Sequence, residues 1–95
     1  MKRAALAAAL LAIGGCGARA TPAECNALLD RYVELLVRQE DPNARPFDVD
    51  SAKALARAKA ASDIEFLRCP REVRRRDVAC ALAAPNADEF EKCMQ

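Results

Sequence analysis

The chain has no histidine, no tryptophan and few aromatic side chains, namely Tyr32, Phe47, Phe66 and Phe90. Histidine is the usual general base near neutral pH, so its absence argues against acid–base catalysis. The sequence also has no G-x-S-x-G motif and no glycine-rich phosphate loop, and its serines, Ser51 and Ser62, have no evident base partner. We therefore predict that the protein is not an enzyme and needs no cofactor.

The chain also has no large excess of charge of either sign. It contains 15 Lys+Arg and 14 Asp+Glu, a formal net charge of +1. Loss of Lys2 and Arg3 with a cleaved leader would leave 13 basic against 14 acidic residues, a net charge of about −1. Such a balance gives no reason to expect a nucleic-acid partner.

The first residues have the layout of an export signal. Lys2 and Arg3 form a positively charged start, residues 4–12 are uncharged and apolar, and Gly14 and Gly15 precede Cys16. A helix that spans a bilayer needs roughly 20 apolar residues, which this run does not reach. The pattern therefore predicts a cleaved leader and no permanent transmembrane helix.

Ile13, Gly14, Gly15 and Cys16 resemble the lipobox of bacterial lipoproteins. The resemblance implies that the Cys16 thiol carries a diacylglyceryl group and that residues 1–15 are removed as a signal peptide. Residues 16–20 would then be the lipidated cysteine and a short tether, holding the domain near the membrane. Members of this family carry two or three acyl chains, which makes the attachment lasting. Because Gly17 follows the cysteine where inner-membrane lipoproteins have Asp, the resemblance implies an outer-membrane location.

A second cleavage site remains open in the same stretch. Ala18-Arg19-Ala20 fits the A-x-A pattern that an ordinary signal peptidase cuts. Cleavage there would give a soluble periplasmic or secreted protein that begins at Thr21. We favour the lipobox, because its cysteine lies at the expected distance behind the apolar run.

The four remaining cysteines predict two disulfide bonds. Cys25, Cys69, Cys80 and Cys93 are an even number in a chain that carries an export signal. Their spacings include no C-x-x-C pair, which disfavours redox chemistry and zinc binding. Four cysteines allow three connectivities. We prefer Cys25 with Cys69 and Cys80 with Cys93, because an antiparallel helical hairpin brings the start of one helix to the end of the next.

Helical patterns dominate residues 21–95. Thr21, Pro22 and Glu24 form a helix-start signal, and apolar residues then follow helical spacing to about residue 40. On this face Tyr32 fits a core residue whose hydroxyl lies at the rim better than a binding residue.

Residues 41–49 read as a loop, followed by a helix over 51–68 with Asp48 or Asp50 as its N-cap. Leu55, Phe66 and Cys69 would share its inner face, a restart near residue 62 is an alternative, and Pro70 ends it.

Residues 78–84 predict a third helix, and Asn86 with Glu89 marks the start of a fourth. No stretch alternates with period two. We expect an all-α domain over 21–95, a small bundle of three to four short helices with two disulfides. Cys80, the pair Asp88-Glu89 and Cys93 give it a resemblance to small exported helical proteins of unassigned role.

One basic cluster stands out, formed by Arg68, Arg71, Arg74, Arg75 and Arg76. It could contact anionic head groups, although a solvated turn is the interpretation that we favour. The leading functional hypothesis is a non-catalytic lipoprotein of the bacterial envelope with a structural or protein-interaction role, bound to the membrane through its lipid. The alternative is a ligand-binding or inhibitory module of the immunity type.

Overall fold

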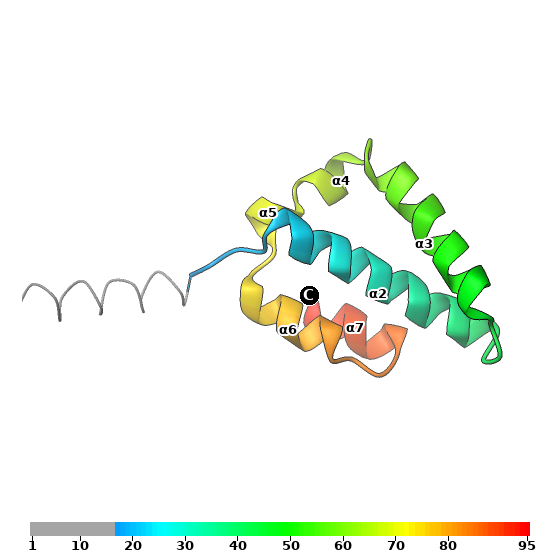
Figure 1. Cartoon of the computed structure of the whole chain (residues 1–95). Coiled ribbons are helices and arrows are strands. Elements are labelled where there is room, and N and C mark those ends of the chain that lie inside the picture. The colour runs from blue at the N-terminus through cyan, green and yellow to red at the C-terminus, as the bar shows by residue number, and fades with distance from the viewer. Residues whose placement is uncertain (1–16) are drawn as a thin grey trace, which may run out of the picture.

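The computed structural model describes residues 17–95, which form six helices and no strand. Their order is α2 (Pro22–Glu40), α3 (Pro46–Ala60), α4 (Ile64–Leu67), α5 (Cys69–Glu72), α6 (Arg75–Leu82) and α7 (Ala87–Cys93). Figure 1 shows α2 running through the middle of the molecule. The predicted all-α class is confirmed, although α4 and α5 make the helices more numerous than the predicted three to four.

The central helix α2 has the bounds that the sequence predicts. The Glu24 backbone N–H donates to Thr21 Oγ1 at 3.1 Å, and the Thr21 N–H donates to Glu24 Oε1 at 2.9 Å. These two bonds form a capping box, with Pro22 in the first turn, where its missing N–H is not needed. At the other end the Asp41 N–H still donates to the Val37 carbonyl before the chain turns.

Helix α3 begins five residues earlier than predicted. Its N-cap is Arg45, whose side chain makes no capping bond, so the predicted N-cap role of Asp48 or Asp50 is wrong. Pro46 occupies the first turn, where its fixed φ favours helix and its lack of an N–H has no cost. The sequence interpretation took both Pro42 and Pro46 as loop residues, but the second proline starts a helix.

The predicted helix over 51–68 is divided in two. Helix α3 ends at Ala60, and Asp63 starts α4 by accepting the N–H groups of Glu65 and Phe66. The alternative of a restart near residue 62 is therefore confirmed. The prediction that Leu55 and Phe66 share one inner face is wrong, because Leu55 on α3 is 59% exposed while Phe66 packs against the core.

Two further boundaries differ from the sequence prediction. Pro70 lies inside the first turn of α5 rather than beyond a helix end. A helix tolerates proline in its first turn, where the missing N–H would have no partner in the helix. Helix α6 begins at Arg75, three residues before the predicted start, and ends at Leu82. The Asn86 side chain accepts the Glu89 N–H at 2.9 Å, so the predicted cap of α7 is confirmed.

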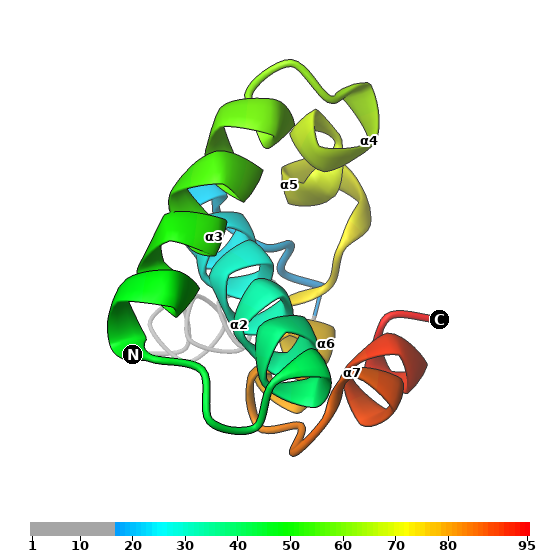
Figure 2. The same cartoon turned by 90° about the vertical axis from the view of Figure 1, so that its right-hand side faces the viewer.

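The core lies between α2 and the hairpin formed by α6 and α7. Apolar residues from these three helices and the segment before α2 make one buried cluster: Ala20, Cys25, Leu28, Leu35, Val78, Ala81, Ala84, Ala87 and Phe90. Most of these side chains are small, so the helices approach closely but bury little apolar area per residue. Figure 2 shows α3 on the opposite side of α2 from α7.

Helix α3 lies outside this core and is joined to α2 partly by ion pairs. Arg57 donates to both carboxylate oxygens of Asp30, at 2.9 and 2.5 Å, and Lys53 reaches Glu34 at 3.4 Å. The pKa of Glu34 is lowered because its bonds to Lys53 and Arg31 outweigh its desolvation, the largest single influence. The lowered pKa favours the ionised carboxylate that both cations need.

The two disulfides join Cys25 to Cys69 and Cys80 to Cys93, with Cα–Cα distances of 6.1 and 5.7 Å. The preferred connectivity is therefore confirmed. The first bond ties α5 to the start of α2, and the second closes the α6–α7 hairpin. Disulfides persist in oxidising compartments, so this pairing indicates an exported protein.

Candidate functional site

Residues 18–20 are part of the folded domain. The Ala20 N–H donates to the Val73 carbonyl at 2.8 Å, and the Arg75 N–H donates to the Ala18 carbonyl at 3.1 Å. These bonds flank an antiparallel bridge between Arg19 and Arg74. The expected tether over residues 16–20 is therefore shorter, because its second half pairs with the segment between α5 and α6. Cys16 and the rest of the lipobox lie outside the described residues.

The pairing depends on the local conformation of the α5–α6 link. Val73 and Arg74 are extended, with φ near −89° and −84° and ψ of 131° and 144°. The Val73 N–H still donates to the Cys69 carbonyl of α5, while the Val73 carbonyl is left to accept the Ala20 N–H. Ala20, which bonds to this link, is only 4% exposed. The predicted arginine cluster and the start of the described chain are thereby held together.

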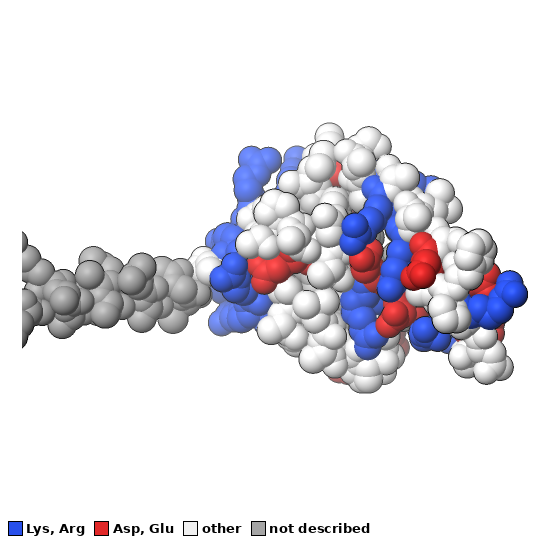
Figure 3. All heavy atoms as spheres, in the orientation of Figure 1, with Lys and Arg blue, Asp and Glu red and all other residues white. Residues whose placement is uncertain are grey.

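The basic end is defined here as the five predicted arginines together with Arg19. All six side chains are exposed: Arg19, Arg68, Arg71, Arg74, Arg75 and Arg76. Figure 1 places α5 and the start of α6 at the end of the domain where the described chain begins, and Figure 3 shows Lys and Arg atoms gathered there. The sequence analysis missed Arg19, because a one-residue bridge leaves no periodic signal.

Carboxylates neutralise only part of this basic end. Arg75 Nε lies 3.3 Å from Glu24 Oε1, and Arg76 Nε lies 3.9 Å from Asp77 Oδ1. The pKa of Glu24 is lowered, chiefly by the backbone N–H of Thr21 and further by Arg75. Within residues 17–95 the other four arginines have no carboxylate within ion-pair distance. A net positive surface remains.

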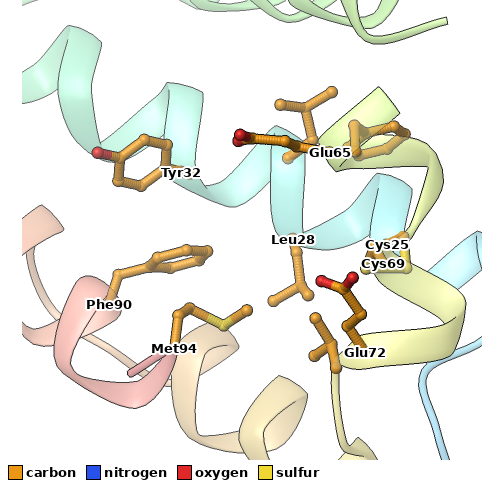
Figure 4. Close-up of a pocket in the computed structure, with 11 residues that line it drawn as sticks. Cys25, Leu28, Tyr32, Glu65, Cys69, Glu72, Phe90 and Met94 are labelled. Carbon is orange, nitrogen blue, oxygen red and sulfur yellow. A yellow bond between two sulfur atoms is a disulfide. The ribbon is translucent and has the colours of Figure 1, made fainter. Parts of the chain in front are cut away.

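A second feature is an apolar groove of about 260 Å³ beside α2. Its lining comes from α2, α4, α5, α7 and the residues that follow α5 and α7: Cys25, Leu28, Leu29, Tyr32, Glu65, Phe66, Cys69, Glu72, Val73, Phe90 and Met94. Figure 4 shows Leu28 and the Cys25–Cys69 disulfide among these side chains, with the carboxylates of Glu65 and Glu72 extending toward the groove. The groove is an apolar surface with acidic groups at its edge.

Tyr32 closes one end of this groove. Its ring lies 5.0 Å from the Phe90 ring, and its hydroxyl donates to Glu91 Oε2 at 3.0 Å. Burial, followed by the bond to Glu91, raises the pKa of Tyr32, so the phenol stays neutral near physiological pH. The predicted arrangement, a core ring with its hydroxyl at the rim, is confirmed.

The described residues hold no cluster of three His, Cys, Asp or Glu side chains suited to a metal ion. Among the helices of residues 17–95, none is long and apolar enough to cross a membrane. Comparisons with protein-family models, curated proteins and solved structures find no match to this chain. The basic end and the apolar groove are thus the two surfaces from which a function can be argued.

Proposed function

We propose that the protein is a small non-catalytic lipoprotein of the bacterial cell envelope, anchored through Cys16 with its basic end against the membrane. The observation that carries the proposal is the pairing of residues 18–20 with residues 73–75. It fixes the arginines beside the point where the lipid would be attached. The domain should then bind anionic membranes more strongly than neutral ones.

The distance from anchor to arginines supports this orientation. A chain spans at most about 3.5 Å per residue, so an anchor attached two residues before Ala18 can reach no further than roughly 7 Å of backbone from it. The Ala18 carbonyl is itself bonded to the Arg75 N–H. Arginine side chains near that point can reach the head groups, where each basic residue contributes about 1 kcal/mol on an anionic surface.

The pairing also favours the lipobox over cleavage after Ala20. A chain that begins at Thr21 would lack Ala18 and Ala20, and would leave the Val73 carbonyl and the Arg75 N–H without these partners. It would also lose the buried side chain of Ala20 from the core. Cleavage before Cys16 keeps all of these contacts. An outer-membrane location follows from Gly17 and the lipoprotein resemblance.

A flotation assay with vesicles tests the orientation separately from the lipid. The full chain with Cys16→Ser, folded under oxidising conditions, is mixed with anionic phosphatidylglycerol vesicles or neutral phosphatidylcholine vesicles. The leader is present in both mixtures, and its Lys2 and Arg3 also favour anionic vesicles, so only the part of the anionic preference that arginine variants remove reports on the basic end. We expect a clear preference at low salt that weakens as salt rises.

Matched variants assign that preference to particular residues. Replacing Arg71 and Arg74 by Gln should lower anionic binding roughly 30-fold, from about 1 kcal/mol for each residue. Replacing Arg38 and Arg45, exposed residues at the other end of α2 and the start of α3, should have little effect. Equal binding to both vesicle types, or an equal loss in the control, would overturn the proposed orientation.

The apolar groove supports a second candidate, a protein-interaction or inhibitory module. Apolar grooves recur as the surfaces into which partner segments place apolar side chains. Both roles are compatible, since the groove and the basic end use different side chains.

A further inference from the structure

We propose that the apolar groove is a docking site for a segment of a partner protein that inserts an apolar side chain next to a lysine or arginine. This gives the proposed interaction role a surface and a partner chemistry. It rests on that role, but it requires neither the lipid on Cys16 nor the arginines of the basic end. Either proposal can therefore fail without the other.

The size of the groove suits a side-chain anchor. Its volume of about 260 Å³ is below the range of roughly 300–1,000 Å³ that is typical of small-molecule sites. Partner segments often bind through one or two apolar side chains placed in a pocket of this kind. Leu28 and Phe90 form buried parts of its lining, and Met94 adds an adaptable edge that is 37% exposed.

The charge at the edge selects a cation. Glu65 on α4 and Glu72 on α5 border the groove, and within residues 17–95 neither lies in an ion pair. Of the other twelve carboxylates of residues 17–95, six lie in ion pairs and six do not, so what distinguishes Glu65 and Glu72 is their place at the edge of the groove. A lysine or arginine beside the inserted side chain would supply the missing partner, whereas an acidic segment would be repelled.

The two carboxylates are not equivalent. Glu72 also borders a polar hollow lined by Arg74 and Arg76, and the positive charge of these arginines offsets part of the negative potential of the Glu72 carboxylate. Glu65 borders the apolar groove and does not border the polar hollow. We therefore expect Glu65 to contribute more to the selection of a cationic segment.

The walls are fixed before a partner arrives. The Cys25–Cys69 disulfide holds α5 against α2, and the Asp63 side chain fixes the start of α4 through the Glu65 N–H at 2.9 Å. A preformed groove loses little conformational entropy on binding, which favours affinity.

The experiment uses the full chain with Cys16→Ser, folded under oxidising conditions, and two labelled helical peptides as probes. One peptide consists of leucine and lysine with leucines on one face, and the other has glutamate in place of lysine. Fluorescence anisotropy measures binding, and amide NMR shifts locate it. We expect the leucine–lysine peptide alone to bind, with shifts confined to α2, α4, α5 and α7.

Variants that replace glutamate by glutamine remove the charge and keep the size of the side chain, and they supply both the test and its control. The double change Glu65→Gln and Glu72→Gln should weaken binding about five-fold, since exposed ion pairs are individually modest, with the larger part from Glu65. Glu40→Gln removes the same charge as Glu65→Gln alone, but from an exposed site at the end of α2, and should leave affinity within about two-fold. These surface changes remove no buried side chain, so folding should be retained.

Four results would overturn the proposal. The first is equal binding of the leucine–glutamate peptide, and the second is an effect of Glu40→Gln equal to that of Glu65→Gln. The third is a set of NMR shifts outside the groove, and the fourth is groove shifts produced by a fatty acid and not by the peptide. That last outcome would make the groove an acyl-chain site. Retained preference for anionic vesicles in the same preparation would show that the membrane proposal stands regardless.

Discussion

Removal of the Cys25–Cys69 disulfide should destabilise the domain more than removal of Cys80–Cys93. The first bond joins residues 44 apart in the sequence and the second joins residues 13 apart. In the loop-entropy model, the constraint on the unfolded chain is worth about 4 kcal/mol for the longer loop and about 3 kcal/mol for the shorter one. Chain entropy alone therefore predicts a difference of about 1 kcal/mol.

Burial increases this difference. Cys25 is 2% exposed and belongs to the central core, whereas Cys80 is exposed. Replacement of Cys25 by alanine removes a buried sulfur and leaves a small void, which costs about 1 kcal/mol more. The full expectation is about 5 kcal/mol for Cys25→Ala with Cys69→Ala, against about 3 kcal/mol for Cys80→Ala with Cys93→Ala. Small domains have a total stability near 5 kcal/mol, so the first variant should be largely unfolded.

Equilibrium urea unfolding, followed by far-ultraviolet circular dichroism, measures both effects. The full chain with Cys16→Ser is the reference, so that no fifth thiol can exchange with either bond. The Cys80–Cys93 variant should keep a cooperative transition at a lower midpoint, and the Cys25–Cys69 variant should show little or none. The reasoning is refuted if loss of Cys80–Cys93 costs as much as loss of Cys25–Cys69, or if neither loss lowers the midpoint.

Three further predictions concern the helices. Thr21→Ala removes the side-chain half of the α2 capping box and should cost about 1 kcal/mol in urea unfolding; an unchanged midpoint would contradict the capping role. The pKa of Glu24 should lie below its ordinary value of 4.5. The ionised carboxylate then stabilises the fold above pH 4.5, and this stabilisation is lost as the pH falls through the lowered pKa. An NMR titration that gives a pKa at or above 4.5 would exclude this contribution. Arg57→Gln breaks the bidentate pair with Asp30 and should speed amide exchange in α3 about two-fold, because exposed ion pairs contribute little, whereas Arg45→Gln, whose partner lies within α3, should not. Equal exchange in both variants would argue against the pair.

Strong local signals account for the parts of the fold that the sequence predicts. Helix α2 begins at a complete capping box, and α7 begins at an Asn86 cap, and both starts are found where expected. Cysteine count and helical hairpin geometry led to the observed disulfide pairs. In each case a few neighbouring residues, or covalent chemistry, determine the outcome.

The errors arise where one residue type serves two opposite purposes. Pro46 and Pro70 were taken as breaks, yet both occupy first turns, and only the tertiary context separates the two roles. Leu55 was assigned to the core because its spacing fits, but α3 turns that side chain outward.

The candidate surfaces were only partly visible in the sequence. The arginine cluster was apparent because its members are neighbours in the chain. Its contact with residues 18–20 depends on a single bridge, and the groove combines side chains of α2 with those of α4, α5 and α7, which lie far from α2 in the sequence. Such juxtapositions require the folded structure.

Intact-mass analysis of the protein from a membrane fraction, before and after reduction, tests the central claim most directly. The account predicts a chain that begins at Cys16, carries diacyl or triacyl mass, and gains two hydrogens for each of its two disulfides on reduction. An unmodified chain that begins at Thr21, or a full chain with all its thiols free, would contradict it.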